Sequence, residues 1–150
     1  MVVEFSGLLR SKIRTKCLGL SWKDKEMEGF DWALESSTWS AHSWIILRAS
    51  ASVQAASAKS YLNYADVAIT RNHSTLRKDH FLFLIAFQQM RDWDAISLQC
   101  RNFITSGSRG SSGAHAGILL LDVQHGRALR FEQDTHGKLH EMIDWVATHI

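Results

Sequence analysis

The stretch AISLQCRNFITSGSRGSSGAHAGILLLD, residues 95–122, decides the fold predicted for this chain. It opens with a short apolar run at 95–98 and closes with a second one at 118–121, each of which has the length of a buried strand. Between them, residues 105–113 hold no apolar side chain and are rich in Gly and Ser. Because α/β proteins place their functional residues where strands open into glycine-rich loops, we expect a site near this loop.

The composition limits the class of protein. The chain has 150 residues and is 45% hydrophobic, which is enough for a globular domain with a core. Its net charge of +2 permits a nucleic-acid partner without requiring one. The longest apolar run, residues 81–87, is far shorter than the roughly 20 residues of a membrane span. Charged residues interrupt the first twenty positions, so we predict no secretory segment, no membrane partner and a cytoplasmic location.

From residue 44 onward, apolar runs alternate with amphipathic stretches. The predicted strands are 44–47, 66–70, 95–98 and 118–121, and the predicted helices are 51–63, 81–90 and 134–150. The run 81–87 suits a buried strand as well, but the polar tail 88–91 favours a helix, which Asp79 would cap. The alternation predicts a three-layer α/β fold, with a mostly parallel four-stranded sheet and helices on both faces.

Residues 1–43 are predicted to be an N-terminal extension, packed or mobile, ahead of an α/β domain at 44–150. Residues 2–20 suit a basic amphipathic helix, which can bind a membrane or nucleic acid but more often docks on its own domain. Trp32, Trp39 and Trp44 stand among Ser and charged residues. Such rings can stack on bases, although burial against the core is the commoner use.

Four short segments follow one another in a familiar order: Ala65-Asp66-Val67, Arg77-Lys78-Asp79-His80, Arg101-Asn102-Phe103 and His115-Ala116-Gly117-Ile118. Taken as the start of the second strand, the start of a helix, the exit of the third strand and the start of the fourth, they resemble the PIN-like domains of bacterial toxin–antitoxin pairs. The resemblance covers residues 44–150. It implies RNA as the substrate, Mg²⁺ or Mn²⁺ as the cofactor, and a small antitoxin protein as a partner.

The resemblance also implies a metal site of three or four carboxylates. By spacing from Asp66, the acidic positions of that family fall here on residues without a carboxylate, namely Ala49, Ser50, Cys100 and Asn102. Only Asp79 keeps its acid. One carboxylate and one neutral amide hold a hard cation poorly. The sequence therefore predicts a degenerate site, with Asp79 as metal ligand and with Asp79 and Asn102 as the catalytic residues of any ribonuclease activity that is retained.

Three further residues are candidates for contact with RNA: Arg101, Arg109 and His115. Arg109 and the loop amides around it can cradle a phosphate, although a simple connector is the alternative. A fold of this lineage can also bind RNA without cutting it. The alternative from another class is a protein-interaction or assembly domain, a homodimer for example, that uses the Trp-rich N-terminal region.

Overall fold

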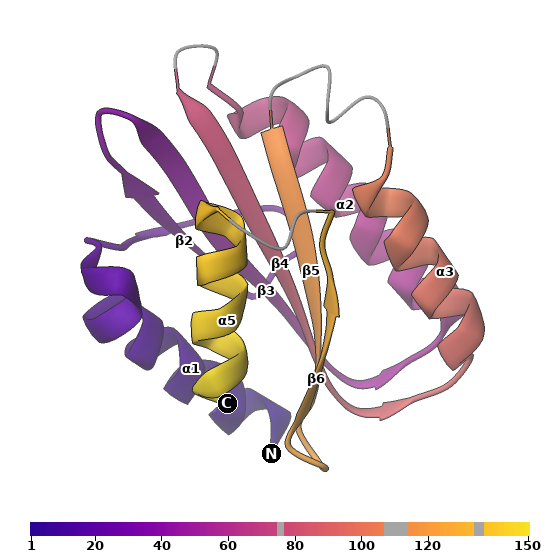
Figure 1. Cartoon of the computed structure of the whole chain (residues 1–150). Helices are drawn as coiled ribbons and strands as arrows, with labels where there is room; N and C mark the ends of the chain where they lie inside the picture. Colours follow the sequence, from indigo (N-terminus) through magenta and orange to yellow (C-terminus); the bar gives the residue numbers. More distant parts are fainter. Residues whose placement is uncertain (75–76, 107–113, 134–136) are drawn as a thin grey trace.

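The computed structural model describes residues 1–74, 77–106, 114–133 and 137–150, and a mixed sheet runs through its centre (Figure 1). The six strands lie in sequence order: β1 (Lys23–Lys25), β2 (Trp32–Ser37), β3 (Ala41–Val53), β4 (Lys78–Met90), β5 (Ala114–Asp122) and β6 (Arg127–Phe131). β3, β4 and β5 are parallel, whereas β1, β2 and β6 pair with their neighbours in antiparallel fashion. The predicted α/β class is confirmed, with a sheet that is larger and more mixed than expected.

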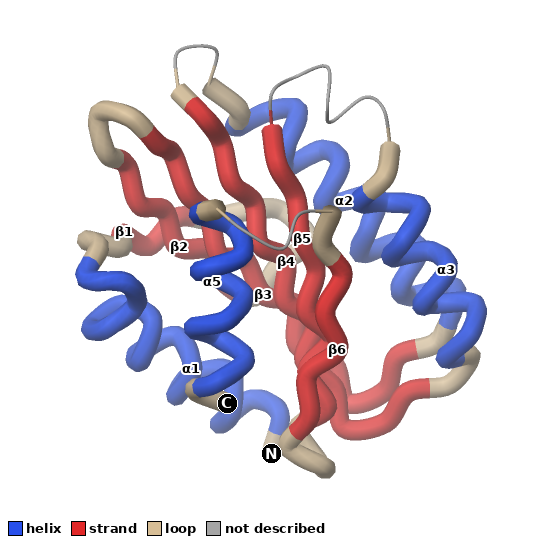
Figure 2. The backbone as a smooth tube through the Cα atoms, in the orientation of Figure 1, coloured by secondary structure: helices blue, strands red, loops and turns tan. Residues whose placement is uncertain are grey.

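Helices lie on both sides of this sheet (Figure 2). On one face, α2 (Ala55–Asn72) connects β3 to β4, and α3 (Trp93–Ile104) connects β4 to β5. On the other face lie α1 (Val2–Lys16), the 3-10 helix η1 (Cys17–Gly19) and α5 (Lys138–Thr148). Parallel neighbours require a crossover connection, and α2 and α3 supply it while burying their apolar sides against the sheet.

Strand β4 is buried on both of its faces. Phe81 and Phe83 join the core beneath α2 and α3, whereas Leu82 and Leu84 join the core beneath α1 and α5. A strand covered on both sides needs no polar alternation and reads as a continuous apolar run. The helix predicted at 81–90 is therefore wrong, and the buried strand left open as its alternative is confirmed.

The strands predicted at 66–70 and 95–98 are also wrong, because both segments lie inside helices. The helix predicted at 51–63 begins later and extends further, as α2. Its buried side holds residues at helical spacing, namely Ala58, Tyr61, Leu62, Ala65, Ala68 and Ile69. In α3, Ile96, Cys100 and Phe103 are buried at the spacing i, i+4, i+7. In both segments the packing of an amphipathic face overrides the strand preference of short β-branched runs.

The predicted boundary at residue 44 falls inside β3. Upstream of it, β2 pairs with β3 along its length, from Trp32 opposite Leu47 to Ser37 opposite His42. Helix α1 buries Leu9 and Ile13 against the sheet, which is the docked alternative for the amphipathic segment. Residues 1–43 thus share a sheet and a core with the remainder of the described chain.

The other predicted elements are present with adjusted ends. The runs 44–47 and 118–121 lie in β3 and β5, as predicted. The C-terminal helix predicted at 134–150 is observed as Lys138–Thr148, and residues 134–136 lie outside the described part. Among the described helices, none combines the length and apolar character that crossing a membrane requires.

Candidate functional site

Polar side chains gather at the amino-terminal ends of the three parallel strands. The register places His42 of β3 opposite Asp79 of β4, and His80 of β4 opposite His115 of β5. Because successive side chains of a strand point to opposite faces, Asp79 and His80 serve different sides of the sheet. This edge therefore carries two polar sites, one on the α2 side and one on the α5 side.

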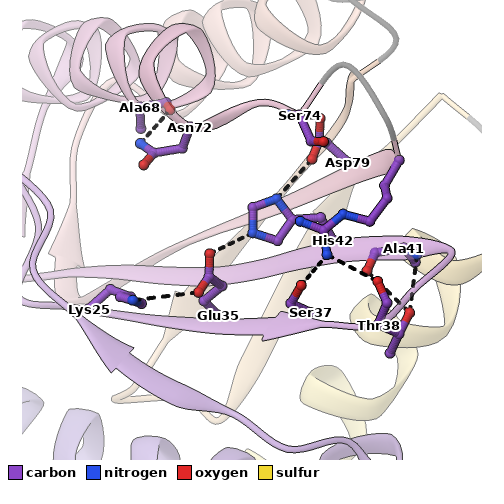
Figure 3. A network of polar contacts seen from close by, with 11 residues as sticks. Lys25, Glu35, Ser37, Thr38, Ala41, His42, Ala68, Asn72, Ser74 and Asp79 are labelled. Atoms are coloured by element: carbon purple, nitrogen blue, oxygen red, sulfur yellow. Dashed lines mark hydrogen bonds and ion pairs between the residues drawn. The ribbon is translucent and has the colours of Figure 1, made fainter.

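On the α2 side, His42 lies between two carboxylates (Figure 3). Its Nδ1 is 3.0 Å from Oδ1 of Asp79, and its Nε2 is 2.6 Å from Oε2 of Glu35. Asp79 is 1% exposed and His42 is 6% exposed, so little water reaches the contacts. The second oxygen of Asp79 accepts the backbone N–H of Ser74 at 2.6 Å. We call Glu35, His42 and Asp79 the histidine cluster.

The carboxylate oxygens of the histidine cluster are directed at partners within it or beside it. Both ring nitrogens of His42 face carboxylate oxygens at hydrogen-bond distance, one of Asp79 and one of Glu35. Lys25 approaches the second oxygen of Glu35, with its Nζ 3.8 Å from Oε1. The cluster therefore offers few free acceptors to a ligand.

On the α5 side, a pocket of about 310 Å³ opens beside the same strand ends. Its lining consists of Lys78, His80, His115, Ala116, Gln133, Gly137, Lys138 and Leu139, and no acidic residue is among these described lining residues. The rings of His80 and His115 stack at a centroid distance of 5.6 Å. We call this hollow the basic pocket.

His80 is the deepest polar group of the basic pocket. The residue is 7% exposed, and its Nδ1 has no hydrogen-bond partner among the residues that the structure describes. Burial lowers the pKa of His80 to about 4, and the positive charge of neighbouring His115 and Lys138 adds to the effect. His80 is therefore neutral at pH 7, with one N–H donor and one acceptor nitrogen.

Helix α5 points its amino terminus at the basic pocket. Gly137 is the N-cap residue, with φ of 92°, and no side chain within the described ranges caps the helix. The first backbone hydrogen bond of the helix runs from the N–H of Glu141 to the carbonyl of Gly137. The amides that precede Glu141 in the first turn lack intrahelical acceptors, and the helix dipole places partial positive charge there. Lys78 and Lys138 lie beside it, so the described lining of the pocket favours an anion.

The structure separates the residues that the sequence assigns to a single site. Asp79 begins a strand rather than capping a helix. Arg101 and Asn102 are exposed on α3 instead of following a strand, and no hydrogen bond or ion pair within the described ranges joins Asn102 to Asp79. His115 lines the basic pocket on the opposite face from Asp79. Arg109 lies outside the described residues.

The four short segments that carry the PIN-like resemblance also lie mostly in elements other than the expected ones. Ala65-Asp66-Val67 lies within α2, Arg77-Lys78-Asp79-His80 leads into β4, and Arg101-Asn102-Phe103 lies near the end of α3. Only the segment that begins at His115 lies in the kind of element that was expected, the strand β5. At three of these four segments, the structure thus has a different element from the one that the PIN-like resemblance implies.

The predicted ligand set does not fit Mg²⁺ or Mn²⁺. Asp79 is buried with its two oxygens directed at His42 and at the amide of Ser74. Within residues 1–74, 77–106, 114–133 and 137–150, no group of three or more His, Cys, Asp or Glu side chains is placed to hold a metal ion. A hard divalent cation needs several oxygen ligands around one point. Metal binding by Asp79 stays a prediction, and the chain's described geometry gives it no support.

Sequence reasoning missed most of both sites. It did not single out Glu35 or His42, which lie upstream of or at the edge of the predicted domain, nor Lys78 and Lys138. One signal was available. His42 precedes Trp44 and Ile46 at alternating positions, which places the three side chains on one face of a strand.

Comparison of the chain with protein-family models, with curated proteins and with solved structures finds no match, so none of the three identifies a PIN-like domain here.

Proposed function

We propose that the protein binds RNA by taking a terminal phosphate into the basic pocket, and that it holds this ligand without cleaving it. The observation that carries the proposal is the described lining of the pocket. It combines Lys78, Lys138 and the start of α5, and holds no acidic residue and no side-chain cap of that helix. Cations beside a helix amino terminus are the arrangement that recurs at phosphate sites.

The buried imidazole of His80 favours a ligand that forms a hydrogen bond as well as carrying a charge. A buried polar atom without a partner costs roughly 1–3 kcal/mol, so native proteins rarely leave one without a reason. A phosphate oxygen or a ligand hydroxyl within reach of Nδ1 of His80 would satisfy it. Because a pocket of about 310 Å³ exceeds what a phosphate group alone fills, room remains for the sugar that bears it.

The contacts of the carboxylates support binding without cleavage. Metal-dependent phosphoryl chemistry needs cations held at the phosphate, and carboxylates hold them. Asp79, the acid that the PIN-like resemblance retains, faces away from the basic pocket and is bound to His42 and Ser74. The antitoxin partner, the toxin–antitoxin lineage and the homodimer stay predictions from the sequence.

The test measures fluorescence anisotropy of a tetra-adenylate that carries a 3′ label and either a 5′-phosphate or a 5′-hydroxyl. We expect the phosphorylated oligonucleotide to bind more tightly, with affinity that falls as salt rises. Lys138→Ala should weaken its binding about tenfold or more, since a charge-assisted hydrogen bond contributes roughly 1.5–3 kcal/mol. The matched control is Lys59→Ala, which removes an exposed lysine of α2 on the other face.

Two outcomes would contradict the proposal. If the two oligonucleotides bind with equal affinity, and Lys138→Ala leaves that affinity unchanged, the 5′-phosphate does not bind in the pocket. Cleavage of the RNA on addition of Mn²⁺, abolished by Asp79→Ala in a protein that still folds, would restore the metal-dependent nuclease that the PIN-like resemblance implies.

A further inference from the structure

Trp39 is the most exposed large apolar side chain of the described residues, at 94%. The neighbouring tryptophans behave differently, because Trp22, Trp32 and Trp44 are buried in the core. The indole of Trp39 stands at the turn between β2 and β3. An exposed indole contributes nothing to the core, and tryptophan is enriched at interfaces, where its ring supplies apolar contact area.

The turn that carries Trp39 is fixed on both sides of the indole. The N–H of Thr38 donates to the carbonyl of Ala41 at 2.9 Å, and the N–H of Ala41 donates to Oγ1 of Thr38 at 3.1 Å. From the residue just before β4, the guanidinium of Arg77 donates to the carbonyl of Thr38 at 3.0 Å and contacts Oγ of Ser37. Trp39 is therefore presented on an ordered support, which lowers the entropy cost of binding through it.

The turn lies at the same edge of the sheet as the starts of β4 and β5 (Figure 1), and residues at those strand starts line the basic pocket. Ala41 pairs with Lys78, which lines the pocket, and two residues of chain lead from Ala41 back to Trp39. Two residues of extended chain and one strand spacing place the Cα atoms of Trp39 and Lys78 at most roughly 12 Å apart. Arg77 contacts the turn and the next residue, Lys78, lines the pocket, so two consecutive cations connect the turn that carries Trp39 with the basic pocket.

We infer that Trp39 stacks on a base of the same RNA whose 5′-phosphate enters the basic pocket, so that the ligand is a 5′-phosphorylated single strand. This inference rests on the proposed function. A single strand supplies all three groups that this surface can bind: a phosphate for the pocket, backbone charge for Arg77 and Lys78, and an unstacked base for the indole. A duplex end would keep its bases paired and offer no free ring face.

The experiment compares Trp39→Ala and Trp39→Phe with the intact protein. The probes are the 5′-phosphorylated tetra-adenylate, a 5′-phosphorylated abasic tetramer, and inorganic phosphate as a competitor. Trp39→Ala should bind the tetra-adenylate roughly 5- to 150-fold more weakly, the range that removal of one stacking ring produces. Trp39→Phe should recover most of that loss, and both variants should bind the abasic tetramer and inorganic phosphate as the intact protein does.

Leu98→Ala is the matched control, because it also removes an exposed apolar side chain, on α3. Unchanged tetra-adenylate affinity in Trp39→Ala would overturn the stacking. So would a loss of equal size for the abasic tetramer, or a Trp39→Ala variant that differs from the intact protein in concentration-dependent dimerisation and not in RNA binding.

Failure of the two proposals can be told apart. If Lys138→Ala weakens binding and Trp39→Ala does not, the phosphate site stands and the stacking is wrong. If Trp39→Ala weakens binding while the 5′-phosphate and Lys138 make no difference, the proposed phosphate site is wrong. The inferred ligand, a 5′-phosphorylated single strand held at both places, is then wrong as well.

Discussion

The two sides of the sheet use the same strand ends in opposite ways. On the α2 side, the charges of Glu35, His42 and Asp79 meet one another and leave little to bind. On the α5 side, Lys78 and Lys138 form no ion pair within the described residues, and a buried imidazole nitrogen lacks a partner there. The residues responsible, Asp79 and His80, are consecutive. Polar groups that satisfy one another stabilise a fold, whereas polar groups left without partners mark where a ligand is expected.

The mutation with the largest expected effect removes a partner from the histidine cluster. Asp79→Ala should lower the free energy of unfolding by several kcal/mol, because the His42 ring and the amide of Ser74 both lose a buried partner, at roughly 1–3 kcal/mol each. Chemical denaturation at pH 7 measures it. Glu26→Ala removes an exposed carboxylate and should change stability by less than about 0.5 kcal/mol. An Asp79→Ala protein as stable as the parent would mean that the histidine cluster contributes no net stability.

The second prediction concerns the pH dependence of stability that His80 causes in the basic pocket. The pKa of His80 is about 4 in the folded protein, below the imidazole value of 6.5, so the unfolded chain binds the proton more readily. Stability therefore falls as pH drops below 6.5, and the loss is complete below about pH 4. At pH 5 the loss from this residue is about 2 kcal/mol. His80→Gln should lose correspondingly less stability between pH 7 and pH 5, and denaturation curves at the two pH values measure the difference. Identical pH dependence in the two proteins would contradict the buried, neutral His80.

A smaller effect is expected at the start of α5. Gly137 has φ of 92° and ψ of −175°, a conformation that residues with a Cβ avoid. Gly137→Ala should cost about 1–2 kcal/mol of unfolding free energy and weaken phosphate binding, because the first-turn amides shift. Gly126→Ala, at φ of 63° in the turn before β6, should cost about 1 kcal/mol and leave phosphate binding unchanged. Loss of phosphate binding in both variants would argue against a specific role for α5.

The smallest effect lies at the rim of the histidine cluster. Lys25 approaches Glu35 at 3.8 Å, and the lysine side chain is 48% exposed. Solvent screens such a pair, so Lys25→Ala should change stability by only a few tenths of a kcal/mol. A loss as large as that of Asp79→Ala would show that the cluster requires the lysine to balance its charge. Thermal and chemical unfolding of the two variants side by side decide between these outcomes.

The sequence predicts the elements whose signal is local. The run at 44–47 and the run at 118–121 are strands, and the C-terminal segment is an amphipathic helix, because each pattern is complete within one element. Helix α3 shows the limit of reading short runs. Residues 95–98 look like a strand by themselves, but the buried spacing of Ile96, Cys100 and Phe103 becomes visible only over two to three turns.

The candidate sites were harder to predict, since their members come from distant parts of the chain. His42 and Asp79 are 37 positions apart and meet because β3 and β4 pair in parallel. Lys78 and Lys138 meet because α5 returns to the same strand ends. Of the residues predicted for the site, His115 lines the basic pocket and Asp79 belongs to the histidine cluster, on the other face of the sheet. No spacing rule in the sequence reports that division.

The sequence by itself determined the α/β class, because apolar runs and amphipathic stretches alternate whichever way the sheet is assembled. Tertiary structure alone decided that residues 78–90 form a central strand, since burial on both faces erases the periodicity that would identify it. Tertiary structure also decided which charges are satisfied. The pleat of β4 directs Asp79 toward a histidine and His80 toward a pocket, and only the pairing of the strands fixes what each of them meets.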